Sequence, residues 1–196
     1  MSDDERCQRI VDDLKEALTL CEQGQVYLAN DCLFYVEEGE LLGYIENAIF
    51  CSIMAGNFYG LMNLFYHSEI PMQKIRVLSQ SKVYFIKTDQ ALNLLKQENY
   101  KDILYLISKN MHAIGCQFVR VKNETSYTII KGAIEYYSRN QSSLVKHVSL
   151  SRFLIDFTGL SKSWIMQTLN ELRKGGYIQT HDLEASVIQK KLPHGY

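Results

Sequence analysis

The sequence lacks the signatures of several protein classes. It contains no apolar run of about 18 residues, so no segment is a candidate membrane-spanning helix. The GxSxG, HExxH and P-loop motifs are absent, and no other pattern indicates an enzyme. The five cysteines form no CxxC pair, and an odd number of dispersed thiols argues against a disulfide framework. We therefore expect a non-enzymatic protein with no metal and no cofactor.

The chain also has little net charge, −1 over 196 residues, but the charge is unevenly distributed. Residues 125–196 carry 9 Lys and Arg against 5 Asp and Glu, whereas residues 1–124 carry 12 against 17. A basic C-terminal part on an acidic remainder suits a partner that bears phosphate groups. The chain begins with the acidic run Ser2-Asp3-Asp4-Glu5, the wrong sign for a signal peptide, so we expect a cytoplasmic protein.

The stretch from Ser149 to His181 has the pattern of a winged helix-turn-helix. Ser149 is a good N-cap for a short helix, and Gly159 can adopt the positive φ angle of a tight corner. Ser161 caps a second helix, which Gly175-Gly176 ends. Two short strands follow, residues 177–180 and 185–189. In proteins with this order of elements the second helix lies in the DNA major groove.

The outward face of that second helix consists mostly of groups that can reach base edges or phosphates: Lys162, Ser163, Met166, Gln167 and Asn170. The apolar side includes Trp164, which the pattern predicts to lie in the core, with its N–H as a possible phosphate donor. The alternative is a pair of amphipathic helices joined by a glycine, with a structural role only.

Residues 25–87 consist of short β segments separated by turn signals, which predicts a barrel or jelly roll. The expected strands are Val26–Leu28, Cys32–Val36, Glu40–Ile45, Ala48–Ile53, Ile75–Leu78 and Lys82–Ile86. An amphipathic helix over residues 4–23, stopped by Gly24, precedes them. We expect Thr88 to cap a helix over residues 89–97.

Residues 99–122 predict a long helix without proline. Its apolar residues alternate spacings of four and three, like the a and d positions of about two heptads: Ile107, Met111, Ile114, Phe118 and Val121. Because helix-turn-helix proteins usually bind two half-sites through a two-fold axis, this stripe favours a homodimer. Ordinary packing against the β domain is the alternative.

The predicted fold class is therefore α+β, in three parts. An N-terminal β-roll with its own first helix covers residues 1–97, a long connecting and dimerisation helix covers residues 98–124, and the winged helix-turn-helix covers residues 125–196.

This architecture resembles the cyclic AMP receptor protein/FNR (Crp/Fnr) family of bacterial transcription regulators, and most of all its divergent enterobacterial type linked to peroxide resistance. Residues 33–40 (LFYVEEGE) look like the family's strand-turn signature, and residues 55–61 (AGNFYGL) like its G-x-x-x-G turn. Residues 158–181 are similar to its helix-turn-helix, and the resemblance spans roughly residues 24–189. It implies a cyclic-nucleotide-binding-like roll and a homodimer on a palindromic operator in double-stranded DNA. RNA polymerase, which activating members contact, is a further implied partner.

The sequence departs from the family at the effector pocket. Members that bind cyclic nucleotide hold the ribose with a Gly-Glu pair and the phosphate with an Arg-Ser pair. Here Leu61 stands at the Glu position, and Pro71-Met72 stand at about the Arg-Ser positions. A phosphate buried without these partners would cost several kcal/mol. We therefore predict that cyclic nucleotide binding is lost and that the pocket is filled, or alternatively admits an apolar ligand. The residues predicted to form this pocket are Leu61, Met62, Leu64, Phe65, Tyr66 and Met72.

The resemblance also assigns DNA contacts. Base contacts transfer to Lys162, Ser163 and Gln167, where Lys162 could bind guanine and Gln167 could pair with adenine. The family commonly has Arg and Glu at the first two positions, which implies a different operator here. The candidate phosphate contacts are Ser149, Ser151, Arg152, Ser161, Lys174 and His181.

Three other readings remain open at this point. The cysteines are too dispersed for the family's iron–sulfur branch, but His67 or His112 could serve as a haem ligand. One of the five thiols could sense oxidants. Finally, the chain could be an adaptor that keeps the fold as a protein-binding scaffold, because fold alone does not determine function.

Overall fold

The computed structural model describes residues 1–45, 48–66, 73–78, 80–123, 125–139, 148–179 and 187–193, without the side chains of Ala48, Phe50 and residues 117–123. The chain divides into two compact units, Met1–Cys116 and Gln117–Tyr196. In the described part of the chain, no helix is both long and apolar enough to cross a membrane.

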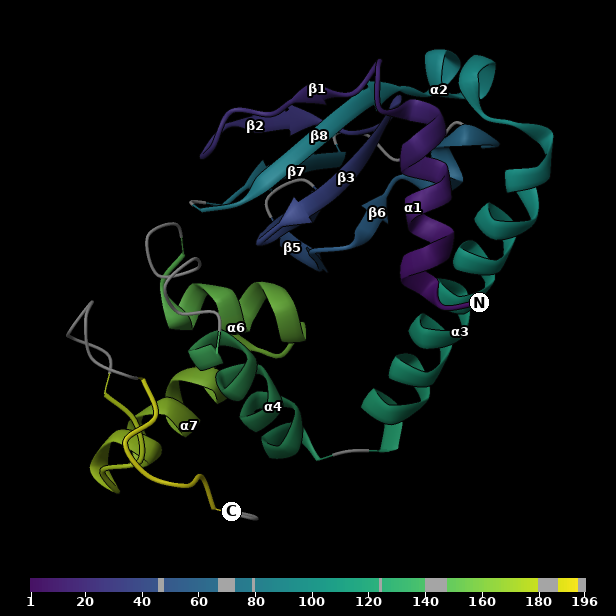
Figure 1. The fold of residues 1–196 in the computed structure, drawn as a ribbon. Helices are drawn as coiled ribbons and strands as arrows, with labels where there is room; N and C mark the ends of the chain where they lie inside the picture. The colour runs from purple at the N-terminus through teal and green to yellow at the C-terminus, as the bar shows by residue number, and fades with distance from the viewer. Residues whose placement is uncertain are drawn as a thin grey trace. The chain divides into compact units, whose positions relative to one another are not determined.

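Two four-stranded antiparallel sheets build the N-terminal unit (Figure 1), with strand orders β1-β8-β3-β6 and β2-β7-β4-β5. The strands are β1 (Thr19–Leu20), β2 (Val26–Leu28), β3 (Cys32–Glu38), β4 (Glu40–Ile45), β5 (Ala48–Met54), β6 (Asn57–Tyr59), β7 (Gln73–Val77) and β8 (Lys82–Lys87). All six expected strands are present within two residues at either end. Together with the helices below, they confirm the predicted α+β class and its roll.

Strand β3 is buried on both faces, and this determines how the unit is layered. Its side chains alternate, as they do in any strand. Leu33 joins the core beneath the helices, whereas Phe34 and Val36 join the core between the sheets. All three are fully buried. One strand therefore links two hydrophobic cores.

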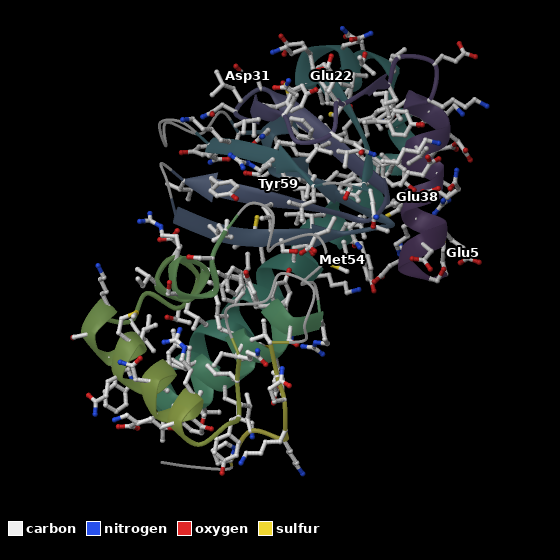
Figure 2. The ribbon with its side chains drawn as sticks, turned by 90° about the vertical axis from the view of Figure 1, so that its left-hand side faces the viewer. Glu5, Glu22, Asp31, Glu38, Met54 and Tyr59 are labelled. Carbon is white, nitrogen blue, oxygen red and sulfur yellow. The ribbon has the colours of Figure 1, made fainter. Side chains whose placement is uncertain are left out.

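Aromatic rings fill much of the space between the two sheets. The Phe34 ring lies 6.0 Å from Phe85, 6.3 Å from Tyr27 and 6.4 Å from Tyr59, measured between centroids. Figure 2 shows Tyr59 among the strands, and its hydroxyl donates to Gln73 Oε1 at 2.9 Å. Burial raises the pKa of Tyr59 above its ordinary value, so this group stays neutral.

The helices of the N-terminal unit cover the outer face of the β1-β8-β3-β6 sheet. They are α1 (Asp3–Leu14), the 3-10 turn η1 (Leu61–Leu64), α2 (Thr88–Leu94), η2 (Gln97–Asn99) and the first part of α3 (Tyr100–Asn123). Arg6 and Arg9 of α1 both pair with the buried carboxylate of Asp102 in α3, the Arg9 contact being 2.5 Å. The Arg6 guanidinium also lies 4.0 Å from the Tyr105 ring centroid. These contacts hold α1 along α3 (Figure 1).

The helix expected over residues 4–23 is wrong in its second half. Helix α1 ends at Leu14, and Thr19–Leu20 form β1, which pairs with β8. Ala17 and Leu18 still pack on the same core as α1, so the apolar pattern continues although the chain is no longer helical. Gly24 is consequently a loop residue at φ 78°, not a helix stop.

The role expected of Thr88 is also wrong. The cap position is Lys87, and Thr88 is the first residue of α2, where it is buried. Its hydroxyl donates to the Asp31 carbonyl at 3.3 Å instead of capping the helix. Helix α2 ends at Leu94, three residues before the expected end. The long helix over residues 99–122 is confirmed within one residue as α3.

The C-terminal unit contains α4 (Ser126–Arg139), α6 (Leu150–Thr158) and α7 (Lys162–Lys174), which pack together (Figure 1). The rings of Tyr136, Phe153 and Phe157 all stack on one another, with centroids 5.8 Å (Tyr136–Phe153), 4.9 Å (Phe153–Phe157) and 5.5 Å (Tyr136–Phe157) apart. The expected hairpin is present as a bridge between Ile178 and Ile188. Thr180, Ala185 and Ser186 of the expected strands lie outside the described residues.

Gly60 should be intolerant of any side chain, since it has φ 89° and an added Cβ would lie 2.5 Å from the Cys32 carbonyl oxygen. Gly24 is a matched control, with φ 78° and nothing within 4 Å of an added Cβ. We expect Gly24→Ala to cost about 1–2 kcal/mol of unfolding free energy from backbone strain alone. Gly60→Ala should cost clearly more in urea unfolding followed by circular dichroism. Equal losses would show that the contact with Cys32 has no effect.

Candidate DNA-binding surface

The corner between α6 and α7 has the geometry that the sequence predicted. Ser149 is the N-cap of α6, and its hydroxyl accepts from Arg152 N. Gly159 ends α6 at φ 68°, a conformation that glycine adopts without strain. Ser161 is the N-cap of α7, accepting from Trp164 N at 3.4 Å. Gly175 caps the end of α7. Both helices therefore begin and end where their capping residues place them.

The orientation of α7 follows from what it buries. Ile165, Leu169 and Leu172 are fully buried, and Thr168 is nearly so. With about 3.6 residues per turn, the opposite face consists of residues spaced by four and three. These are Ser163, Gln167, Asn170 and Lys174, and all four are exposed.

The three predicted base contacts are all exposed and lie within the first two turns of this helix. Lys162 is the first residue of α7. It lies about 100° around the helix axis from the centre of the exposed face. Ser163 Oγ lies 3.2 Å from Ser161 Oγ. The Gln167 amide donates to Glu171 Oε1 at 3.3 Å, an exposed contact that a base could replace. Their role as base contacts remains a prediction.

The predicted phosphate contacts fall into two groups. Ser149 and Ser161 are helix caps whose hydroxyl oxygens accept from the backbone, which leaves their O–H groups able to donate to a phosphate. Arg152 is exposed, and its Nε binds Asp156 at 2.7 Å. Ser151 is half-buried and Lys174 is exposed at the end of α7, whereas His181 lies outside the described residues.

The predicted core position of Trp164 is wrong. Its side chain is 39% exposed. At about 100° per residue it lies on the flank of α7, between the buried face and the exposed face, and the amphipathic pattern could not separate the two.

Two exposed cations of the hairpin were not among the predicted contacts. Lys190 and Lys191 follow the Ile178–Ile188 bridge, and Lys190 Nζ lies 4.2 Å from the Tyr177 ring centroid. The signal for them in the sequence is the pair of adjacent lysines directly after the second expected strand. They extend the positive charge of the unit beyond α7.

The apolar stripe of α3 divides between two environments. Ile107 is half-buried against the core beneath the helices, as the packing alternative expected. Met111 and Ile114 are 54% and 63% exposed. Leu104, three residues before Ile107, is 57% exposed and extends the stripe by one step. The side chains of Phe118 and Val121 lie outside the described residues.

The residues at the effector pocket are only partly described. Leu61 and Leu64 are buried in the core beneath the helices. The prediction that Met62, Phe65 and Tyr66 fill the pocket is wrong, because they are 50%, 51% and 62% exposed. Pro71 and Met72 lie outside the described residues, as does His67. In the described part of the chain, no group of three or more His, Cys, Asp and Glu side chains could hold a metal ion.

Four of the five cysteines are poor candidates for oxidant sensing. Burial raises the pKa of the Cys7 thiol to about 11, and it raises those of Cys21 and Cys51 to about 12. Burial also raises the pKa of Cys32. Because the thiolate is the reactive form, a raised pKa disfavours reaction of these four thiols near neutral pH. Cys116 is exposed, with its Sγ 3.4 Å from His112 Nε2.

Comparison with known proteins finds a domain family that matches the C-terminal part and a distant relative of most of the chain. The family described as winged helix-turn-helix DNA binding matches residues 126–194. The protein named inhibitor of hydrogen peroxide resistance from Escherichia coli (strain K12) is 23% identical over 171 residues, which cover 85% of this chain and 81% of that protein.

Solved structures share the fold of nearly the whole chain. The c-di-GMP responsive global regulator CLP of Xanthomonas campestris is 16% identical with a TM-score of 0.64, covering 92% of this chain and 99% of that one. A CRP/FNR family transcriptional regulator from Thermus thermophilus is also 16% identical, with a TM-score of 0.61, covering 84% and 90%. Both are named as regulators, the second as a transcriptional regulator. The chain therefore has the Crp/Fnr fold with a C-terminal winged helix-turn-helix, and the Escherichia coli inhibitor of hydrogen peroxide resistance is a distant homologue.

Proposed function

We propose that this protein is a cytoplasmic, sequence-specific transcription regulator that binds a palindromic operator as a homodimer. The observation that carries the proposal is the exposed polar face of α7. Its residues Ser163, Gln167, Asn170 and Lys174 are all exposed to solvent and do not belong to the core. The face belongs to a winged helix-turn-helix unit, and helices in this position enter the major groove.

Different residues supply affinity and sequence preference in this proposal. Gln167 pairs with an adenine edge, and Lys162 and Ser163 read the neighbouring bases. Lys174, Arg152 and the hairpin lysines bind phosphates, together with the cap hydroxyls, and these contacts set the register without reading sequence.

The homodimer is proposed on the exposed stripe of α3. Leu104, Met111 and Ile114 are more than half exposed although they are large and apolar, and they follow heptad spacing. A second copy of α3 would cover them and would present two α7 helices to two half-sites. In this proposal residues 98–124 connect a roll domain (1–97) to a DNA-binding domain (125–196). The same residues form the contact between the two copies of the chain.

The loss of cyclic nucleotide binding is the second part of the proposal. Leu61, at the position of the family's ribose-binding Glu, is buried and carries no polar group. Between the sheets, the rings of Tyr27, Phe34, Tyr59 and Phe85 pack at centroid distances of 5.7–6.4 Å. These ring contacts support a packed interior between the sheets.

The biological setting is proposed from the distant homologue. That protein is named for hydrogen peroxide resistance, and the alignment covers most of both chains. This name supports our proposal that the regulator acts in the oxidative stress response. RNA polymerase is the partner through which it would act if it activates transcription.

Replacing Gln167 and Lys174 should have different consequences, although both lie on the exposed face of α7. Gln167→Ala should cost about 1–3 kcal/mol on the preferred operator and relax specificity at one base pair. Lys174→Ala should weaken all duplexes about equally. Fluorescence anisotropy at fixed salt, on operators recovered by genome-wide immunoprecipitation, measures both. An equal loss on every duplex for both variants would contradict the division of roles.

Charge in the stripe of α3 should separate the dimer. The double variant Met111→Asp/Ile114→Asp places carboxylates where two copies would meet, and each side chain is already exposed within one chain. We expect a folded monomer in sedimentation and a loss of operator affinity of at least about tenfold. Leu28→Asp is a matched control, because Leu28 is 65% exposed on β2. A double variant that stays dimeric would refute this interface.

Cyclic nucleotides should not change the melting temperature of the protein. A ligand that binds only the folded state at 100 times its dissociation constant stabilises it by about 2.7 kcal/mol. We therefore expect no increase in melting temperature with millimolar cyclic AMP or cyclic GMP. A concentration-dependent increase would contradict the loss of this site, while leaving the assignment of the DNA-binding surface intact.

A further inference from the structure

Among the side chains that the structure describes in residues 117–196, Trp164 is the one large hydrophobic side chain that is exposed. The other exposed residues of α7 are Lys162, Ser163, Gln167, Asn170 and Lys174, all polar. An isolated exposed apolar residue is not unusual by itself. Its position on the proposed DNA-binding helix is what gives it meaning.

The backbone around Trp164 is fixed on both sides. Its N–H donates to Ser161 Oγ, and its carbonyl oxygen accepts from Thr168 Oγ1 at 3.0 Å. Helical side chains lean toward the N-terminus, so the indole covers the first turn of α7. This end of a recognition helix is the part that enters the groove.

The rotation of α7 places Trp164 at the side of the exposed face. Trp164 lies about 60° from Gln167 around the helix axis, on the flank that also carries Glu171. Residues at the centre of such a face meet base edges on the floor of the groove. Residues on the flank meet its wall, which consists of deoxyribose and phosphate. Glu171 lies about 10 Å further along the axis, beyond the first turn.

We propose that Trp164 anchors α7 to one wall of the major groove. Its apolar ring packs against a deoxyribose, and its Nε1–H, a donor with no acceptor capacity, donates to the adjacent phosphate oxygen. The inference rests on the proposed function and adds a contact of another kind, apolar and independent of sequence. Trp164 then contributes affinity on every duplex, whereas Gln167 contributes preference.

The chain offers a direct probe, because Trp164 is its single tryptophan. The full-length protein is titrated with a mixed-sequence, fluorescently labelled duplex at low salt. We expect the tryptophan emission to change in parallel with the anisotropy of the duplex. This measurement needs no variant, so it does not depend on how a substitution folds.

Substitutions then measure the energy of the contact. Trp164→Ala should weaken binding about tenfold on the mixed duplex and on an operator alike. Trp164→Phe keeps an aromatic ring but lacks the N–H. Its affinity should lie between those of the wild-type protein and Trp164→Ala. Leu28→Ala, which removes an exposed apolar group from the N-terminal unit, should change nothing.

Three results would overturn the inference. If the anisotropy rises while the tryptophan emission stays constant, Trp164 does not meet DNA and the proposed function stands. If the Trp164→Ala loss disappears when deoxyuridine replaces thymidine, the ring contacts a base methyl group and not the wall. If no duplex binds at all, the proposed function fails and the inference fails with it.

Discussion

The burial of Ile165, Leu169 and Leu172 fixes the rotation of α7, and the character of the DNA-binding surface follows from it. All three are fully buried. Each such side chain contributes about 1.5–3 kcal/mol. The cap at Ser161 contributes about 1 kcal/mol and sets where the helix starts, but not which side faces outward. Packing therefore decides that Gln167 faces solvent, and capping decides that it does so one turn into the helix.

The N-terminal unit depends in a similar way on the two-sided burial of β3. Leu33 belongs to the core beneath the helices and Phe34 to the core between the sheets. The strand can neither shift in register nor leave either layer without exposing a buried residue. The rings of Tyr27, Phe34, Tyr59 and Phe85 pack together in this second core.

Most of the site could be predicted from the sequence because its signals are local. Serine caps, a corner glycine and apolar spacing within a few residues placed α6 and α7 correctly. Trp164 was misplaced because a flank residue at the boundary of an amphipathic pattern can be buried or exposed, and only the packed domain decides. Leu104 was omitted from the α3 stripe, although its spacing continues it.

The rest of the fold depends on pairings that no short pattern contains. Strand β1 has two residues, and it exists because β8 lies beside it. Ala17 and Leu18 continue the apolar spacing of α1 although they lie beyond its end. They do so because they pack on the same core as α1. The role of Thr88 could not be predicted either, because the carbonyl group that its hydroxyl binds belongs to Asp31, which is distant in sequence.

The salt dependence of duplex binding is the sharpest test of whether α7 binds DNA. When a protein neutralises several phosphates, the logarithm of its binding constant falls linearly with the logarithm of the salt concentration. The slope is about −0.9 for each phosphate contact. Lys174, Arg152 and the lysines of the hairpin predict a steep slope corresponding to several contacts per subunit. A flat dependence, or no binding at low salt, would contradict the assignment of α7 as a DNA-reading helix and would favour a protein-binding scaffold.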